Sequence, residues 1–342
     1  MKVTITDVAK LASVSIKTVS RVINNEPSVR KATSDKVMIA VKELNYQPNL
    51  AARNLAGSKS FTIGLVYDNP NAYYVLDMQN GILSCCKTEG YELLIHPCSY
   101  ANKDMVEELK TMVRRARISG LVLTPPLSEN SEVINMLDDQ NIHYVRILSG
   151  QEADPQQTDC IYVNDHNAAY EVSNHLIKQG HKHIAFLSGD KGHKSTHERL
   201  AGYKESLIEN NIEIDESLIL EGEYSFSSGV ENAKSVINLN NNVTAIIACN
   251  DEIAAGALFA ARLMDIKIPE QLSISGFENS PFSRQTWPKL TTASQSIETI
   301  AQHAAKLLFS KTRGQRNKDK EIIKTFTPEL VIRDSTGPAN KS

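Results

Sequence analysis

The stretch Ile5–Asn24, with the sequence ITDVAKLASVSIKTVSRVIN, decides how the first part of this chain folds. Its first half predicts a short helix that begins after a capping residue, either Thr4 or Thr6. The apolar side chains of this helix share one stripe and are Val8, Ala9, Leu11 and Ala12. A tight turn over residues 12–14 then ends the helix.

The second half of the stretch predicts another helix, with Ser15 as its cap. Its apolar positions lie three or four residues apart and are Val19, Val22 and Ile23. The side chains left facing outward are Ile16, Lys17, Ser20 and Arg21. Two helices joined by so short a turn form a helix-turn-helix, which places its second helix in the major groove of DNA.

The residues after this motif complete a small helical domain. The segment Ser34–Leu44 has the spacing of a third helix, and Pro48 breaks the helical pattern soon afterwards. The alanine-rich segment Leu50–Gly57 has room for about two helical turns, which is too short to be stable in isolation. We expect this segment to become ordered only when a partner orders it.

Charge is unevenly divided along the chain. Ten basic residues against four acidic ones give residues 1–59 a formal charge of +6, which leaves −9 for the remainder of a chain whose total is −3. A basic small domain on an acidic body suits a protein that binds a polyanion at one end. A solvated charged surface is the alternative, and the helix-turn-helix favours the first interpretation.

Composition sets further limits. The 342 residues exceed what one core usually holds, so a small domain and a larger two-lobed one are expected. No apolar run reaches the roughly 18 residues of a membrane-spanning helix, and no signal peptide is recognisable, so we expect a cytoplasmic protein. The five cysteines show no CxxC spacing and are expected to be buried free thiols.

From Phe61 onward, short apolar runs alternate with amphipathic segments, which indicates βα units built around parallel sheets. The expected strands are Thr62–Tyr67, Glu92–Pro97, Gly120–Thr124, Tyr144–Leu148, Ile184–Ser188, Leu218–Glu221, Ala245–Ala248 and Ser273–Phe277. The expected helices include Tyr73–Thr88, Lys103–Ala116, Asn167–Gln179, His197–Asn210, Ser228–Ile237 and Glu252–Met264. So many strands favour two doubly wound lobes, with a ligand site between them at the carboxyl ends of the strands.

These features resemble the LacI/GalR family of bacterial transcription regulators over nearly the whole chain. In the first 57 residues the resemblance rests on Ile5–Asn24, Glu43–Asn49 and Ala51–Gly57. In the remainder it rests on Ile63–Val66, Gly180–Phe186, Glu198–Tyr203, Cys249–Asp251 and Leu290–Thr292. The resemblance implies an N-terminal all-α helix-turn-helix head-piece plus an α/β two-lobed, periplasmic-binding-protein-like body with two doubly wound parallel sheets.

The resemblance also implies which head-piece residues contact DNA. Ile16 and Lys17 resemble the family's variable base-reading pair, and Arg21, one turn later, can donate two hydrogen bonds to a guanine edge. The residues that resemble phosphate-positioning groups are Ser15, Thr18 and Asn24. A merely solvated lysine is the alternative for Lys17.

In the expected hinge, Leu55 resembles the leucine that family members insert between base pairs from the minor groove, with Asn49 and Ala52 beside it. The resulting kink lets more protein contact DNA, which offsets an unstacking cost of a few kcal/mol per step. The alternative for Leu55 is a buried core leucine.

The implied effector site combines hydrogen-bonding groups with an aromatic ring. Arg199 resembles the family's effector-binding arginine, whose planar guanidinium suits vicinal hydroxyls or a carboxylate. Asn250 matches a ligand-contacting asparagine, while Glu278 is one carbon longer than the usual aspartate, so its hydrogen-bond geometry is open. Tyr224 falls where the family often has a ring that stacks on a sugar. Three residues for which packing or helix capping is an equal alternative are Tyr73, Tyr74 and Asp165.

Other motifs favour neither an enzyme nor a metalloprotein. His193 and His197 lie four residues apart, but no third metal ligand has a suitable spacing. No GxGxxG, Walker, GxSxG or HExxH motif occurs, so we expect no catalytic activity and no cofactor.

The expected division of the chain has five parts. Residues 1–46 form the helix-turn-helix DNA-binding domain and residues 47–59 form the hinge. The first lobe of the effector domain takes residues 60–160 plus about 293–322, and the second takes 161–292 plus about 323–335. Residues 336–342 form a flexible tail that lacks a leucine-zipper repeat, which favours a dimer over a tetramer.

The sequence and the resemblance together predict a repressor of carbohydrate-utilisation genes that binds a pseudo-palindromic operator as a homodimer. A small molecule between the lobes, with a sugar favoured and a nucleobase the alternative, would control operator affinity allosterically. The protein would lie in the cytoplasm, on the nucleoid when bound to DNA, without contacting a membrane. A sugar-binding receptor without DNA function is the alternative.

Overall fold

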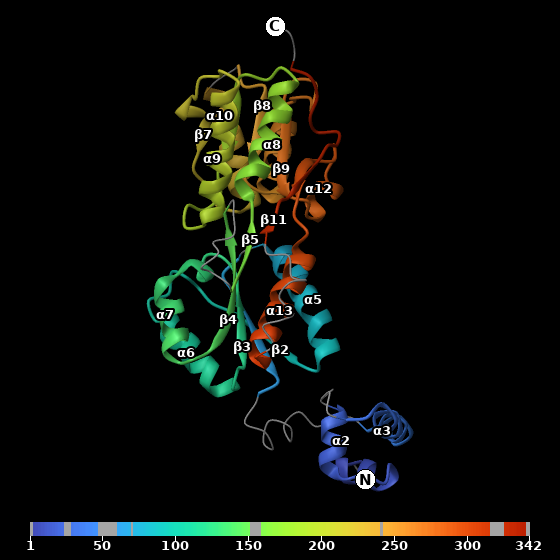
Figure 1. The fold of residues 1–342 in the computed structure, drawn as a ribbon. Helices are drawn as coiled ribbons and strands as arrows, with labels where there is room; N and C mark the ends of the chain where they lie inside the picture. The colour runs from blue at the N-terminus through green and yellow to red at the C-terminus, as the bar shows by residue number, and fades with distance from the viewer. Residues whose placement is uncertain are drawn as a thin grey trace. The chain divides into compact units, whose positions relative to one another are not determined.

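The computed structural model describes residues 3–23, 29–46, 60–69, 71–150, 159–239, 242–314 and 325–339 (Figure 1). The chain forms two units, Met1–Phe61 and Thr62–Ser342, which we call the head-piece and the body. The predicted hinge at 47–59 lies outside the described residues, as do four of the predicted DNA-contacting residues: Asn24, Asn49, Ala52 and Leu55.

Three helices form the described part of the head-piece: α1 (Ile5–Leu11), α2 (Ile16–Ile23) and α3 (Lys31–Glu43). The turn between α1 and α2 passes through Ser13, whose backbone is left-handed with a φ of 52°. The buried residues of its core are Val8, Ala9, Ala12, Val19, Val22, Val37 and Ala40. The predicted helix-turn-helix is therefore confirmed, with its third helix starting earlier than expected.

The prediction that Leu11 belongs to this core is wrong, because its side chain is 44% exposed. At 3.6 residues per turn, Leu11 lies roughly 100° around the helix from the centre of the stripe that Val8, Ala9 and Ala12 form. That stripe already covers the face of α1 that packs on the other two helices, so Leu11 points away from them.

The first sheet of the body has six parallel strands among the described residues, in the order β11-β5-β4-β3-β1-β2. They are β1 (Thr62–Tyr67), β2 (Glu92–Pro97), β3 (Gly120–Leu123), β4 (His143–Ser149), β5 (Cys160–Val163) and β11 (Thr325–Phe326). Helices α5 (Ala72–Glu89) and α13 (Ile297–Arg313) lie side by side on one face, and α6 (Met105–Ala116) and α7 (Ser131–Asp139) cover the other (Figure 1). A short 3₁₀ helix, Leu127–Glu129, precedes α7.

The second sheet also has six described strands, in the order β12-β10-β9-β8-β6-β7, and β12 alone of these runs antiparallel to its neighbour. They are β6 (Ile184–Leu187), β7 (Ile219–Leu220), β8 (Ala245–Ala248), β9 (Ser273–Glu278), β10 (Thr291–Ser294) and β12 (Glu329–Val331). The helices of this lobe are α8 (Asp165–Lys178), α9 (Lys194–Glu209), α10 (Phe226–Leu239), α11 (Asp251–Leu263) and α12 (Pro281–Gln285), with a 3₁₀ helix at Glu216–Leu218. Helix α8 packs on α9, and α10 packs on α11.

Two lobes with doubly wound sheets confirm the predicted fold class. The chain passes from one sheet to the other after Val163, after Ser294 and after Phe326. These crossings fall a few residues beyond the expected boundaries, because each boundary strand completes its pairing before the chain leaves the lobe. The carboxyl ends of the parallel strands of both sheets face the space between the lobes, where open α/β sheets bind ligands.

The C-terminal segment corrects another expectation. Thr336, predicted to begin a flexible tail, is buried, and its hydroxyl lies 2.8 Å from the hydroxyl of Thr291. The Gly337 amide donates to the Ser273 hydroxyl at 3.0 Å, and the Ala339 amide donates to the Gln179 carbonyl at 2.9 Å. These bonds tie the segment to the second lobe as far as Ala339.

Two expectations from composition concern the cysteines and the helices of the described residues. All five cysteines are buried free thiols, as predicted, and burial raises the pKa of Cys86 to about 12 and of Cys98 to about 11. None of the helices in the described part of the chain combines the length and apolar character needed to cross a membrane.

Candidate effector site and nucleic-acid interface

The outward face of α2 carries the side chains predicted to read DNA. Ile16 is 48% exposed, and Lys17 and Arg21 are also exposed, while Val19 and Val22 anchor the helix from its other face. An exposed apolar side chain beside two cations is suited to contact base edges and phosphates together.

Hydrogen bonds fix where the two helices of the motif begin. The Ser15 hydroxyl accepts from the Thr18 amide at 3.1 Å and lies 2.9 Å from the Thr18 hydroxyl, so it caps α2 as predicted. At α1, the Asp7 carboxylate accepts from the Thr4 amide and the Thr4 hydroxyl, at 2.9 and 2.7 Å. These two bonds also lower the pKa of Asp7. The phosphate contacts expected of Ser15 and Thr18 stay predictions.

In the body, a cavity opens between the two lobes at the carboxyl ends of the strands. It brings together six of the seven predicted effector residues, which are Tyr74, Asp165, Arg199, Tyr224, Asn250 and Glu278. Polar lining residues that the sequence predictions omitted include Asn71, Ser149, His193, Ser195 and Gln295. All five lie within a few residues of a strand end or a helix start, and that position was the available signal for them.

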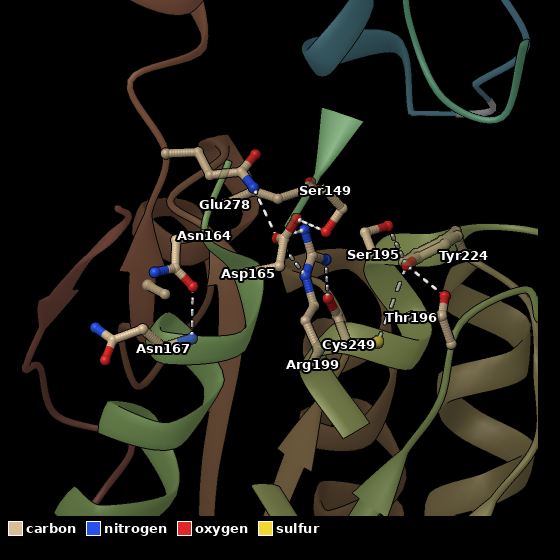
Figure 2. Close-up of polar contacts among 12 residues, drawn as sticks. Ser149, Asn164, Asp165, Asn167, Ser195, Thr196, Arg199, Tyr224, Cys249 and Glu278 are labelled. Carbon is tan, nitrogen blue, oxygen red and sulfur yellow. Dashed lines mark hydrogen bonds and ion pairs between the residues drawn. The ribbon is translucent and has the colours of Figure 1, made fainter. Parts of the chain in front are cut away.

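Arg199 lies at the centre of the cavity wall (Figure 2). Its Nε and Nη2 donate to the same oxygen of Asp165 at 2.9 and 2.8 Å, and its Nη1 donates to the Cys249 carbonyl at 2.6 Å. The guanidinium also stacks 3.8 Å from the centre of the Phe277 ring. Burial acts to lower the pKa of Arg199, but the negative neighbours, Asp165 foremost, outweigh it and raise the pKa above its ordinary value. The arginine therefore stays charged inside the protein.

Asp165 forms an ion pair with this arginine, and its side chain is only 2% exposed. Its other oxygen accepts from the Ser149 hydroxyl at 2.6 Å, which links the second lobe to the end of β4 in the first (Figure 2). Gln295 adds a bond to Asp165 at 3.2 Å. Asp165 therefore pairs with Arg199 inside the second lobe and, through Ser149, also links the two lobes.

Asn250 presents a donor to the cavity. Its oxygen accepts from the Ile253 amide at 2.8 Å and so caps α11. Its side chain is fully buried, and its Nδ2 has no hydrogen-bond partner among the residues that the structure describes. Because an unsatisfied buried donor costs about 1–3 kcal/mol, this group is suited to bind an oxygen of a ligand.

Glu278 reaches across the cleft. Its Oε2 accepts from the Asn71 side-chain amide at 2.6 Å, and Asn71 is the N-cap of α5 in the first lobe. The carboxyl is carried by a left-handed backbone, with φ values of 97° at Glu278 and 59° at Asn279. The geometry left open by the extra carbon is thus resolved: the longer side chain bonds the opposite lobe.

Burial raises the pKa of Glu278 to about 8 from an ordinary value of 4.5, and the nearby Asp251 and Asp165 add to the rise while Arg199 opposes it. Between about pH 4.5 and 8, the folded chain keeps a proton on Glu278 that the unfolded chain releases, so the free energy of unfolding falls as the pH rises. The contribution of Glu278 to stability is therefore complete below about pH 4.5 and is lost as the pH rises through 8.

We expect the free energy of unfolding of the wild type to fall by about 2 kcal/mol more than that of Glu278→Gln between pH 6.5 and 8.5. Asp251, whose pKa burial raises to about 6, has mostly titrated before this window. Urea unfolding at the two pH values measures the difference. Equal slopes for the two proteins would contradict the assignment.

The two tyrosines at the start of α5, both predicted to bind the effector, point in different directions. Tyr74 lines the cavity, and burial raises its pKa above the ordinary value. Tyr73 does not line it: the ring is 36% exposed and packs edge-on against Phe282 of α12, with centroids 5.8 Å apart. Consecutive residues on a helix point about 100° apart, so only one of the pair can face the cavity.

Tyr224 closes another side of the cavity. Its hydroxyl lies 2.7 Å from the Thr196 hydroxyl and 3.4 Å from the Ser195 hydroxyl (Figure 2). His193 packs edge-on against the ring at 5.4 Å. The His193–His197 spacing considered for metal binding is used differently, since the His197 ring bonds the Lys191 carbonyl at 2.8 Å.

A head-piece with an exposed second helix and a body with a buried ion pair in the cavity between its two lobes define a ligand-responsive DNA-binding regulator. Residues 4–49 match the bacterial regulatory proteins of the lacI family, and residues 173–336 match a periplasmic binding protein-like domain. The HTH-type transcriptional regulator DegA of Bacillus subtilis (strain 168) is 33% identical over 341 residues, covering 99% of this chain and 100% of DegA. The HTH-type transcriptional repressor PurR of Vibrio vulnificus (strain CMCP6) is 30% identical and covers 98% of this chain and 99% of PurR.

Solved structures of transcriptional regulators are similar to this chain over nearly its whole length. A lac repressor dimer bound to operator and the anti-inducer ONPF matches with a TM-score of 0.75 and 28% identity, and a CelR–cellobiose complex with a TM-score of 0.72 and 25% identity. Each covers 98% of this chain and is itself covered completely. The chain belongs to the LacI family of bacterial transcriptional regulators.

Proposed function

We propose that this protein represses carbohydrate-utilisation genes and that a sugar bound between its lobes controls its affinity for operator DNA. The observation that carries the proposal is the unpaired Asn250 amide beside the Arg199–Asp165 pair in the cleft. Planar donors and a carboxylate acceptor at one point suit the vicinal hydroxyls of a sugar. The sugar-bound CelR and operator-bound lac repressor structures support the same role.

A ligand would act by changing how the lobes close. The cavity has about 50 Å³ of free space, far less than the roughly 300–1,000 Å³ of small-molecule pockets. A sugar therefore enters only if the Asn71–Glu278 bond breaks and the lobes move apart. Operator affinity changes only as far as the ligand prefers one arrangement of the lobes.

Exposed apolar side chains on the body support a homodimer. Leu76 and Leu83 on α5 are 49% and 44% exposed. In the second lobe, Phe226 and Phe259 form an exposed aromatic pair with centroids 5.6 Å apart, and Trp287 is 81% exposed. A two-fold symmetric dimer would cover such surfaces and would bind a pseudo-palindromic operator. We place this dimer in the cytoplasm, where its operator is.

The proposal is tested by titrating the full chain against an operator selected from a random duplex library, with and without sugars. We expect at least one sugar to change the operator affinity at constant salt. An affinity that no small molecule changes would refute the allosteric part. Failure to select any DNA sequence would refute the regulator itself.

We expect Arg21→Ala to weaken binding to the selected operator by about 1–3 kcal/mol, which is roughly 5- to 150-fold, and to relax the sequence preference at one base pair. Ligand binding by the body should be unchanged, because the substitution lies in the other structural unit. Arg115→Ala, which removes an exposed arginine from α6, serves as the matched control. Fluorescence anisotropy on operator variants makes the measurement, and equal losses for both substitutions would count against the role of Arg21.

A further inference from the structure

A second hollow lies beside the effector cavity. We call it the outer groove, and it is walled by Tyr67, Asp68 and Glu108 of the first lobe and by Asp190 and Glu223 of the second. Three residues, Asn69, His193 and Tyr224, line both this groove and the cavity, so the two spaces are adjacent. The groove has about 680 Å³ of free space, within the roughly 300–1,000 Å³ of small-molecule pockets.

The charged side chains that line the outer groove are all negative among the described residues. Four carboxylates line the groove, those of Asp68, Glu108, Asp190 and Glu223, and no lysine or arginine does so among the described residues. Burial lowers the pKa of His193, so the ring is mainly neutral at pH 7 and adds little positive charge. An anion entering here would approach several like charges without a counter-ion.

The inner cavity also lacks an unpaired positive charge, among its described lining residues, that could bind an anion. Its arginine is already matched by Asp165, which receives two of its hydrogen bonds and is equally buried. Glu278, whose pKa burial raises to about 8, lies beside this pair and adds no positive charge. A ligand carboxylate or phosphate would have to displace Asp165 and leave that carboxylate buried without a partner, which is costly.

We infer that the effector is an uncharged sugar of at least two rings, with one ring in the inner cavity and the next in the outer groove. The inner ring would bind Arg199 and Asn250 after the Asn71–Glu278 bond opens. The outer ring would donate hydroxyl hydrogen bonds to the groove carboxylates and pack against the Tyr67 ring. This inference rests on the proposed function, since it concerns the ligand of the same cleft.

The test is isothermal titration of the full chain with neutral disaccharides (cellobiose, maltose, lactose and melibiose), with glucose and galactose, and with galacturonate and glucose 6-phosphate. We expect at least one disaccharide to bind at least tenfold more tightly than either monosaccharide, and neither anion to bind at the same concentrations. A monosaccharide or an anion that equals the best disaccharide would overturn the inference, as would a panel in which nothing binds.

Variants localise the second ring. Tyr67→Ala should weaken the disaccharide about tenfold and leave the affinity for its inner monosaccharide unchanged. Tyr100→Ala is the matched control, because this tyrosine is 48% exposed nearby but does not line the groove. Glu223→Gln, at an exposed position, should give a smaller loss confined to the disaccharide. Equal effects of Tyr67→Ala on both sugars, or none on either, would overturn the assignment of the groove.

This outcome is separable from that of the proposed function. Titration reports ligand binding in the absence of DNA, whereas the operator experiment reports DNA affinity. A disaccharide that binds the body without changing operator affinity would support the groove and refute the allosteric control.

Discussion

Arg199→Met is expected to destabilise the body by about 3–5 kcal/mol and to abolish effector binding. The substitution leaves Asp165, which is 2% exposed, with neither its guanidinium partner nor water, and the Cys249 carbonyl loses its donor. The methionine refills much of the volume against Phe277, so the loss reports charge rather than a cavity. Urea unfolding of the full chain and ligand titration measure the two effects.

The control for this substitution is Arg262→Met, at an exposed arginine in the last turn of α11, which should change stability by less than about 0.5 kcal/mol. The double variant Arg199→Met/Asp165→Leu should regain most of the stability, because neither charge is then left unpaired, but not the ligand binding. A single variant within about 1 kcal/mol of the wild type would show that the pair is not held as described.

Gly256→Ala is expected to destabilise the second lobe by about 1–3 kcal/mol or more, although alanine favours a helix by about 1 kcal/mol over glycine. Helices α10 and α11 touch backbone to backbone here. A Cβ on Gly256 would lie 2.2 Å from the Phe226 carbonyl oxygen, and one on Gly229 would lie 2.2 Å from the Ile253 oxygen. Neither obstacle is a side chain that can rotate away, so the helices must separate.

Gly150→Ala is the control, because its nearest neighbour would be 3.6 Å away and its backbone does not need a glycine. Denaturant unfolding compares the two variants with the wild type. Loss of stability in Gly150→Ala alone, or a gain in Gly256→Ala, would contradict the close crossing of the two helices.

The helices and strands that the sequence predicted share a local pattern, and those it omitted depend on distant contacts. Strands β1, β2 and β8 match their predicted ranges because continuous apolar runs stand between turn residues. Helix α13 was omitted, although it is 17 residues long. It packs against α5 in the first lobe, which the chain enters again after Ser294.

The strands β5, β10, β11 and β12 were omitted for a related reason. Each has two to four residues, but the predicted strands β3, β6, β7 and β8 are as short, so length alone does not explain the omission. They are strands because they pair with neighbours that other parts of the chain supply; β11, for example, pairs with β5. The same dependence hid the packing of Thr336, whose partner Thr291 is 45 residues away.

What the sequence by itself determined is whatever a local pattern can encode: the helix-turn-helix at Ile5–Asn24, its cap at Ser15, the succession of βα units and the family. The tertiary structure decided which residues of the cavity contact one another. Glu278 and Asn71 are 207 residues apart, and no local pattern states that the extra carbon of the glutamate spans the cleft. It also decided that Asp165 neutralises Arg199 and that Tyr74 rather than Tyr73 lines the cavity. These are distances between side chains on separate elements, and only the packing of the two lobes sets them.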